Sequence, residues 1–219
     1  CPQETVQFLD TQFEHDEVDV YRVNGPVDLV RLMHVPDQVL RPQLGLPVFA
    51  PGLSKGIGKV NKGKDFFEVL KKQDILLHHP FQSFSPVIEF IQQAAHDPQV
   101  VAIKLTVYRT GTDSVIMETL IDAAKYGKEV TVVVELMARF DEQANLNWAS
   151  RLEDVGAHVV YGVVGHKTHS KMALVVRREQ VEGQRPVLRR YVHLGTGNYH
   201  ARTARLYTDF GLMTSNDEI

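Results

Sequence analysis

From about residue 74 onward, apolar residues recur with the spacings of alternating strands and helices. Residues 100–107 form a mostly apolar run rich in β-branched side chains. Residues 130–134 form a second run that is apolar on both faces, as in the central strands of a parallel sheet. Between them, Ile116, Leu120 and Ala124 mark one face of a helix that stops at Gly127. This order predicts an α/β unit with right-handed crossovers.

The same alternation continues on both sides of that unit. Ser85 and Pro86 begin a helix with an apolar stripe that ends before Pro98, and a second helix with apolar positions at 144, 148, 152 and 155 ends at Gly156. Residues 158–161 and 172–176 have the composition of further strands. We therefore predict a mixed sheet with helices on both faces.

Residues 1–73 follow a different pattern, in which short apolar segments alternate with breaks. Residues 18–23 alternate as a strand does, and residues 27–33 have the spacing of a short helix. Four prolines between positions 36 and 51 exclude long regular elements there, and residues 55–64 form a loop rich in glycine and lysine. We place a domain boundary after residue 73, with a smaller α+β segment before it.

Composition and charge narrow the classes of partner and compartment. The 219 residues carry a formal net charge of −3, so no global basic field would gather nucleic acid, and an anionic ligand must be bound by a local basic cluster. Cys1 is the only cysteine, which excludes an internal disulfide and fits a reducing cytoplasm. No apolar run approaches the roughly 20 residues of a membrane-spanning helix. Because the chain lacks an initiator methionine and ends abruptly, we expect both ends to be boundaries within a longer protein.

Residues 58–64 match the glycine and lysine spacing of a phosphate-binding P-loop. Asp65, however, stands where a P-loop needs a serine or threonine hydroxyl to hold magnesium, and its carboxylate would face the phosphates. The preceding segment contains Pro47 and Pro51 and is not a buried strand. We therefore interpret residues 58–64 as a basic loop.

A His-x-Lys pair, His169 and Lys171, opens a predicted strand directly after a loop. Residues two apart on a strand point to the same side, so the two side chains would face one ligand together. Imidazole is a competent nucleophile near neutral pH, and an ammonium group can neutralise a phosphoryl oxygen. Two alternatives stay open: the pair is a surface accident, or His166 and His169 form half of a zinc site, although no cysteine or obvious carboxylate ligand lies nearby.

Other polar residues follow the predicted strands at comparable places. Residues 194–199, Leu-Gly-Thr-Gly-Asn-Tyr, form a tight turn whose exposed backbone N–H groups and Asn198 amide suit an anion. Arg109 ends the first central strand and Arg139 follows the second. Because the carboxyl ends of parallel strands meet at one edge of a sheet, where such folds bind ligands, we expect the arginines to converge there. The alternative for each arginine is a surface ion pair with one of two aspartates, Asp113 or Asp141.

Together these residues resemble a known family. The His-x-Lys pair followed by residues 195–198 resembles the half-site of the phospholipase D superfamily. Three further segments are similar to those of the long-chain polyphosphate kinases that work through phosphohistidine: Tyr108 with Arg109, residues 134–142 and residues 203–209. The resemblance runs from about residue 74 to the end. It implies a phospholipase D-like catalytic domain over residues 74–219, with residues 1–73 as the end of the family's head domain.

Carried over by position, the resemblance implies that His169 is the phosphorylated nucleophile and that Lys171 assists it. Arg109 and Arg139 match the family's magnesium and phosphate site. Because a guanidinium group is always protonated and cannot ligate a cation, we expect both to clamp phosphate oxygens that share the Mg²⁺ ion.

The resemblance also implies that Asn198 binds phosphate and that Tyr207 contacts the nucleotide, the alternative for Tyr207 being a core aromatic. The chain departs from the family's pattern at Ser170, where alanine is commoner, and at His166 and His200, whose protonation the sequence leaves open. The implied partners are ATP, ADP and polyphosphate, with Mg²⁺ as cofactor and no nucleic acid. The implied full-length enzyme is a homo-oligomer in the cytoplasm or at the membrane periphery.

The implied reaction is the reversible transfer of the ATP γ-phosphate to polyphosphate through a phosphohistidine. The chain contains no second His-x-Lys pair, whereas the family carries a second half-site further along, so we expect these 219 residues to be inactive alone. One alternative is a phosphodiesterase or nuclease of the phospholipase D type that completes its site as a homodimer, although Val176 stands where those enzymes place an aspartate. Another is a non-catalytic module that binds polyanions.

Overall fold

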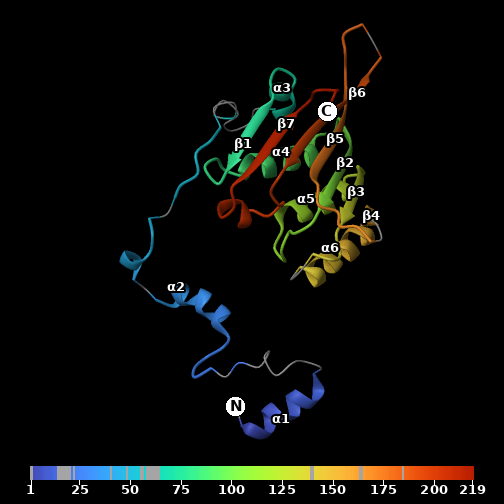
Figure 1. Cartoon of the computed structure of the whole chain (residues 1–219). Coiled ribbons are helices and arrows are strands. Elements are labelled where there is room, and N and C mark those ends of the chain that lie inside the picture. Colours follow the sequence, from blue (N-terminus) through green and yellow to red (C-terminus); the bar gives the residue numbers. More distant parts are fainter. Residues whose placement is uncertain are drawn as a thin grey trace. The chain divides into compact units, whose positions relative to one another are not determined.

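The computed structural model describes residues 2–13, 21, 23–39, 41–47, 49–54, 57, 65–138, 141–162, 165–183 and 185–219. Contacts divide the chain into two compact units, residues 1–49 and 50–219, whose elements are shown in Figure 1. The short helix α3 (Phe66–Leu70), which lies before the boundary predicted after residue 73, belongs to the second unit. The assignment of residues 1–73 to a head-type domain stays a prediction.

The first unit consists of short helical segments: α1 (Gln3–Gln12), the 3-10 helix η2 (Leu29–His34), α2 (Val35–Gln38) and the 3-10 helix η3 (Pro42–Leu44). Prolines stand in the first turn of α2 and of η3, where a missing N–H costs no hydrogen bond. The helix predicted over residues 27–33 overlaps η2, whereas most of the predicted strand at 18–23 and all of the 58–64 segment lie outside the described residues. No described residue of this unit is buried.

The described part of the second unit is built on a mixed sheet of seven strands in the order β1-β7-β6-β5-β2-β3-β4. The strands are β1 (Ile75–His79), β2 (Val100–Val107), β3 (Glu129–Val134), β4 (His158–Tyr161), β5 (Lys171–Glu179), β6 (Val187–Gly195) and β7 (Asp209–Thr214). β2, β3 and β4 pair in parallel, and the other neighbours are antiparallel. The strands predicted at 100–107, 130–134, 158–161 and 172–176 are confirmed.

The helices α4 (Ser85–His96), α5 (Val115–Lys125) and α6 (Glu142–Asp154) are also those that the apolar periodicity predicted. The Ser114 hydroxyl caps α5 by accepting a hydrogen bond from the Met117 N–H at 3.3 Å. Helix α3 meets α4 through Phe67 and Phe90, whose ring centroids are 6.0 Å apart, while α4 packs on α5 and α5 on α6. None of the helices in the described ranges is long and apolar enough to cross a membrane.

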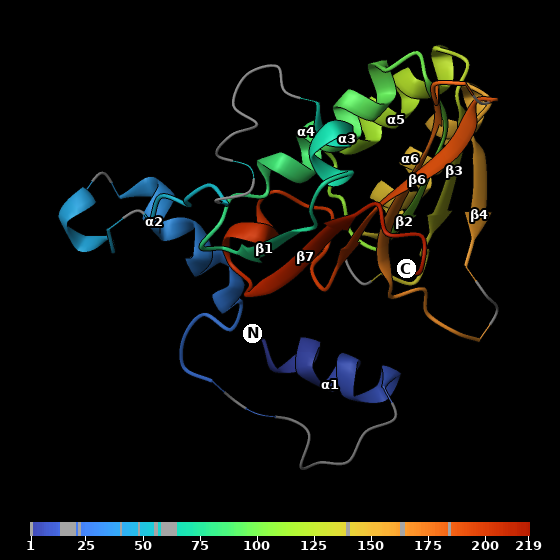
Figure 2. The ribbon, with the colours of Figure 1, turned by 90° about the horizontal axis from the view of Figure 1, so that it is seen from above.

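All four of these helices lie on one face of the sheet, and Figure 2 shows α3, α4 and α5 along that side. The prediction of helices on both faces is therefore wrong in this detail. The chain passes from β2 to β3 to β4, each time to the next strand in the same direction across the sheet. Because both crossover connections are right-handed, their helices α5 and α6 lie on the same face. The burial of β3 agrees, because Val130, Val132 and Val134 are buried whereas Thr131 and Val133 are partly exposed.

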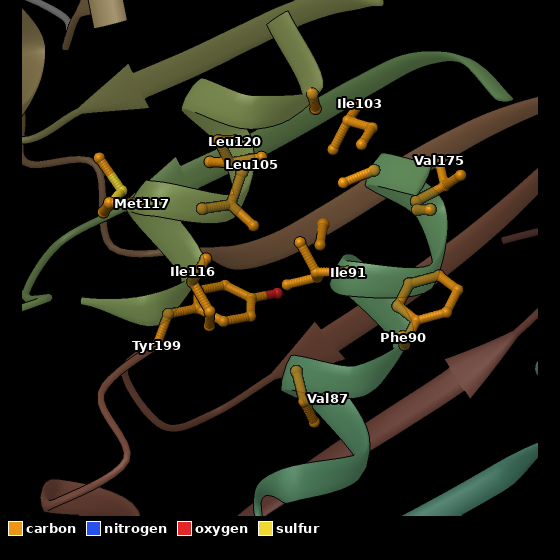
Figure 3. Packing of buried hydrophobic residues seen from close by; sticks show 14 of the residues in the cluster. Val87, Phe90, Ile91, Ile103, Leu105, Ile116, Met117, Leu120, Val175 and Tyr199 are labelled. Carbon is orange, nitrogen blue, oxygen red and sulfur yellow. The ribbon is translucent and has the colours of Figure 1, made fainter. Parts of the chain in front are cut away.

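The hydrophobic core fills the space between this helical layer and the sheet. Figure 3 shows side chains that α4 (Phe90 and Ile91), α5 (Leu120) and β2 (Leu105) contribute to this core, all of them fully buried. Full burial of such side chains is worth about 1.5–3 kcal/mol each, so this layer supplies most of the favourable free energy that fixes the sheet.

A buried carboxylate, Glu179, ties α3 to the end of β5. It accepts hydrogen bonds from the Tyr191 hydroxyl and from Arg177 Nη1 at 3.0 Å, and it lies 3.2 Å from Lys71 Nζ. Burial is the largest single effect and by itself raises the pKa of Glu179, but the hydrogen bonds from Tyr191, Arg177 and Lys71 together outweigh it and hold the pKa below the ordinary value. The carboxylate is therefore ionised within the fold.

Strand register brings several loops to one edge of the sheet. β2 and β3 end level, because Val107 pairs with Val134. β5 runs antiparallel to β2, so its first residue, Lys171, lies near the last residue of β2, and Lys171 pairs in turn with Gly195 at the end of β6. The loops that follow β2, β3 and β6 therefore share this edge with the loop that precedes β5.

Candidate active site

The His-x-Lys pair lies at this edge, and both of its side chains approach the ring of Tyr108. The imidazole of His169 meets that ring edge-on with 5.2 Å between centroids, and Lys171 Nζ lies 5.1 Å from the same centroid. His169 is exposed, as a nucleophile must be, whereas Lys171 is only 5% exposed. The two side chains therefore converge as the sequence predicts, with an aromatic ring as their common neighbour.

Lys171 is held in place by the backbone beside it. Its ammonium group donates a hydrogen bond to the carbonyl oxygen of His169 at 2.5 Å. Burial lowers the pKa of Lys171, and the charge of Asp209 opposes that effect in part. The ammonium group is thus fixed close to the nucleophile and only weakly solvated, which strengthens its attraction for an anion.

Arg109 approaches the same ring, with its guanidinium carbon 5.6 Å from the Tyr108 centroid. Its Nε lies 3.2 Å from a carboxylate oxygen of Asp141, so the ion pair that was the alternative for this arginine is present. One-third of the Arg109 side chain remains exposed, at 34%, so the ion pair does not bury it. Arg139 lies outside the described residues, and its role stays a prediction.

A buried glutamate, which sequence reasoning missed, fixes the loop that carries His169. Glu135 follows β3 and is 3% exposed. Its carboxylate accepts hydrogen bonds from the Thr168 N–H at 2.6 Å and from the Met137 N–H at 2.8 Å. The residue immediately before the nucleophile is thereby tied to the end of the central strand.

Two neutral side chains strengthen the same junction. The Thr106 hydroxyl donates to the carbonyl oxygen of Ser170 at 2.7 Å and accepts from the Met172 N–H at 3.0 Å, so β2 holds the chain on both sides of Lys171. The amide of Asn145, on α6, donates to the carbonyl oxygens of Tyr108 and Glu135, at 3.0 and 2.8 Å. Backbone around the candidate nucleophile is therefore fixed from three elements.

One backbone N–H group of the 195–198 turn, that of Thr196, does not fit the prediction of N–H groups that face an anion. The Thr196 N–H donates to the carbonyl oxygen of Phe210 at 2.9 Å, so it is used by the sheet and does not face an anion. The Thr196 hydroxyl donates to Asp209 at 2.8 Å. Gly197 packs so closely on Asp209 that a Cβ there would lie 2.5 Å from a carboxylate oxygen. A negative group, Asp209 of β7, thus lies against the turn, and binding of phosphate by the Asn198 side chain stays a prediction.

The remaining predicted residues occupy distinct places. Tyr207 is 62% exposed and is therefore not a core aromatic. Nδ1 of His200 accepts the Thr203 N–H at 3.2 Å, so in the neutral ring the proton is on Nε2. His166 is exposed and lines, with Glu135 and Tyr161, a cavity of about 350 Å³. Within the described ranges, no group of three His, Cys, Asp or Glu side chains could hold a metal ion, so His166 and His169 are not part of such a group.

Comparison with known proteins gives the family. Residues 65–219 match the profile described as polyphosphate kinase C-terminal domain 1. The polyphosphate kinase of Burkholderia multivorans is 60% identical over 218 residues, which cover 100% of this chain and 31% of that protein. The polyphosphate kinase of Burkholderia ambifaria strain AMMD is 64% identical over 204 residues, 93% of this chain and 29% of that protein.

Solved structures give the same result. The crystal structure of polyphosphate kinase from Porphyromonas gingivalis matches with a TM-score of 0.74 at 32% identity, covering 99% of this chain and 32% of that chain. A phospholipase D family member, Nuc from Salmonella typhimurium, matches with a TM-score of 0.47 at 16% identity over 66% of this chain and 83% of its own. The fold is the predicted α/β class with a mixed sheet, as in that polyphosphate kinase. The chain spans about a third of the length of these polyphosphate kinases. On the profile match and on the identity across its whole length, the chain belongs to the polyphosphate kinase family.

Proposed function

We propose that this chain provides the nucleophilic half of a polyphosphate kinase active site and that His169 carries the phosphoryl group between ATP and polyphosphate. The observation that carries the proposal is the cluster at the sheet edge, where an exposed imidazole, a buried ammonium group and a guanidinium group surround Tyr108. The names of the relatives supply the substrate class.

The reaction follows from the chemistry of a neutral imidazole. A ring nitrogen of His169 attacks the γ-phosphorus of ATP, the bond from that phosphorus to the β,γ-bridging oxygen breaks, and ADP leaves with the electron pair. A terminal oxygen of the polyphosphate chain then attacks the same phosphorus. The P–N bond breaks, and the chain grows by one phosphate while the imidazole returns to its neutral form. Each step is reversible, because the P–N bond keeps the phosphoryl group at high transfer potential.

The neighbouring side chains act on the transferred group by charge and position. Lys171, fixed on the backbone of His169, neutralises an equatorial oxygen as the phosphoryl group passes. Arg109, which approaches the same ring, is proposed as one clamp on phosphate oxygens, and Arg139 as a second. Asn198 donates its amide to phosphate, and Tyr207 presents an exposed ring to the nucleotide. Glu135 touches no reacting group and positions the loop.

Magnesium enters the proposal with the nucleotide. The residues predicted at the magnesium site are arginines, whose guanidinium groups cannot ligate a cation, so they fit Mg²⁺ only through phosphate oxygens. The described side chains likewise include no cluster of three metal-ligating groups. When bound to ATP, Mg²⁺ would neutralise phosphate charge, and Arg109 and Arg139 would bind the remaining oxygens.

We further propose that this chain does not synthesise polymer by itself. It covers about a third of its relatives and contains one His-x-Lys pair, whereas the reaction needs a complete cage of charge around the phosphoryl group. The test is therefore a chimera in which this chain replaces its 60% identical counterpart in the Burkholderia multivorans polyphosphate kinase. The chimera should form polyphosphate from ATP and an acid-labile, base-stable protein phosphate.

The matched variants are His169→Ala and His166→Ala, two exposed histidines three positions apart. His169→Ala should abolish both the protein phosphate and polymer synthesis, because it removes the imidazole that meets Tyr108 beside Lys171, whereas His166→Ala should keep measurable activity. Labelling that survives in His169→Ala would overturn the proposal. Cleavage of phosphodiesters by the chain itself, as a dimer, would favour a nuclease instead.

A further inference from the structure

Two buried histidines lie beneath the 195–198 turn, on β1 and β6, with β7 between them. His79 is 4% exposed and His193 is 2% exposed. Nδ1 of His79 lies 2.9 Å from the carbonyl oxygen of Gln82, and Nδ1 of His193 lies 2.7 Å from the hydroxyl of Tyr199. Each ring thus has one nitrogen engaged by the protein. The catalytic proposal uses neither ring.

The other nitrogen of each ring points to a common small space. Among the described residues, Nε2 of His79, Nε2 of His193 and Oδ1 of Asn198 are buried polar atoms without a hydrogen-bond partner. All three residues line one cavity, in which the space open to the centre of a water-sized sphere is about 10 Å³. A Cβ on Gly211 would lie 2.7 Å from Nε2 of His193 and 3.6 Å from Nε2 of His79, so both nitrogens face the same point above that glycine.

The hydrogen-bonding capacity of these atoms can be assigned. A carbonyl oxygen only accepts, so Nδ1 of His79 carries the proton that it shares with Gln82, and Nε2 of the neutral ring is an acceptor. Oδ1 of Asn198 is an acceptor as well. Burial, and to a smaller extent the nearby His79, lowers the pKa of His193 to about 3, so that ring is neutral at physiological pH. The Tyr199 hydroxyl lies 2.7 Å from Nδ1 of His193 and 3.5 Å from the His193 carbonyl oxygen, and we assign its proton to the shorter contact, with Nδ1. The proton of His193 is then on Nε2, and the space is surrounded by one donor and two acceptors.

We propose that one water molecule is bound between His79, His193 and Asn198 as a fixed part of the fold. It donates its two protons to Nε2 of His79 and Oδ1 of Asn198 and accepts one from Nε2 of His193. A buried water commonly makes about three hydrogen bonds and needs roughly 10–15 Å³ of such space, and this cavity meets both requirements.

Other occupants fit the same atoms less well. An anion would face two acceptors and a single donor. A metal ion would need further ligands, and the described side chains form no group of three His, Cys, Asp or Glu that could hold one. Leaving all three buried atoms without a hydrogen-bond partner would destabilise the fold, because each has lost its contact with solvent. Water is the occupant that satisfies every atom at once.

The consequence for the active site concerns Asn198. The water anchors Oδ1 of the side chain in the interior, so the amide nitrogen is left as the end that can donate to a phosphate. This step rests on the proposed function; the water itself does not. The two histidines are then positioning residues, which act on the phosphate site through Asn198.

Two measurements on the unchanged chain test the water. Nitrogen-15 NMR of the imidazole rings at neutral pH should find the proton on Nδ1 of His79 and on Nε2 of His193. A high-resolution crystal structure should show a solvent peak within hydrogen-bond distance of all three atoms. A proton on Nδ1 of His193 would overturn the proposal, because three acceptors cannot share the two protons of one water. Absence of the peak would overturn it as well.

A pair of glycine variants tests the consequence. Gly211→Ala places a methyl group where the water would be, whereas Gly52→Ala, whose Cβ would meet its nearest neighbour, the Phe81 carbonyl oxygen, at 3.7 Å, is the matched control. We expect Gly211→Ala to weaken binding of tripolyphosphate about tenfold, the loss of roughly one hydrogen bond, and Gly52→Ala to leave it unchanged. Equal binding by both variants would contradict the role given to Asn198. If the unchanged chain binds no tripolyphosphate, the proposed function fails while the solvent peak still decides the water.

Discussion

Glu135→Gln tests whether the loop that carries His169 must be held by the buried Glu135 carboxylate. The carboxylate accepts two backbone N–H groups, from Thr168 at 2.6 Å and from Met137 at 2.8 Å. Glutamine has nearly the same shape but keeps one acceptor oxygen, so its NH₂ group must face one of the two N–H donors. One N–H group is then left buried without an acceptor.

The magnitude follows from these contacts. A hydrogen bond to a charged group contributes about 1.5–3 kcal/mol, and the removal of a buried charge returns part of its desolvation cost. We therefore expect the free energy of unfolding to fall by about 2 kcal/mol. In the chimera the rate of phosphoenzyme formation should fall about 10- to 100-fold, because a shift of the nucleophile by a fraction of an ångström is costly for phosphoryl transfer.

The assays are urea denaturation of the chain and single-turnover labelling of the chimera with ATP. Glu118→Gln is the control, since Glu118 forms an exposed ion pair with Arg151 at 2.8 Å and should change stability by less than about 0.5 kcal/mol. Rescue of labelling by Glu135→Asp without recovery of full stability would separate positioning from folding. Wild-type stability together with wild-type labelling in Glu135→Gln would refute the reasoning.

Three further predictions rest on other parts of the structure. Arg109→Lys in the chimera keeps the charge but loses the planar guanidinium fork. The rate of single-turnover labelling should fall by the equivalent of about 2–4 kcal/mol of transition-state stabilisation, with folding unchanged. A wild-type rate would mean that Arg109 is only a surface partner of Asp141. Glu179→Gln should lower the free energy of unfolding by about 3 kcal/mol at neutral pH. The folded pKa of Glu179 is below its ordinary value of 4.5, so this contribution to stability is present above pH 4.5 and is lost as the pH falls through the folded pKa. The free energies of unfolding of variant and wild type, measured by urea titration, should therefore converge in acid. A difference that stays constant with pH would contradict the assignment. The chain alone should bind tripolyphosphate weakly near His169 with an affinity that falls steeply with salt in calorimetry, and salt-independent binding would exclude a basic cluster as the site.

Much of the fold could be predicted because local signals agree with the tertiary arrangement. The apolar stripe and the proline and serine of residues 85–96 predict α4, and the β-branched run at 100–107 predicts β2 with its observed bounds. The distribution of helices could not be predicted. Val133 is apolar although it lies on the face without helices, so a pattern of apolar residues on both faces did not reveal that only one face is covered.

The motif of the candidate site could be predicted, whereas the side chains that hold its backbone in place could not. The hydroxyl of Thr106 bonds to a carbonyl 64 residues away and the carboxylate of Glu135 to an N–H 33 residues away, and no local spacing encodes such contacts. A weak signal existed for Glu135, since it is a charged residue directly after three consecutive valines, residues 132–134. The use of Thr196 by β7 was hidden for the same reason, because its partner Asp209 lies 13 residues further along the chain.

Mapping of the phosphate is the most direct test of whether His169 carries the phosphoryl group. The chimera would be incubated with ATP and Mg²⁺, stopped in base, digested, and sequenced by electron-transfer mass spectrometry. We expect one phosphorylated residue within this chain, His169, with a mass gain that disappears in acid and is absent from His169→Ala. Phosphate on His166, on a serine or threonine, or on no residue of this chain would contradict it.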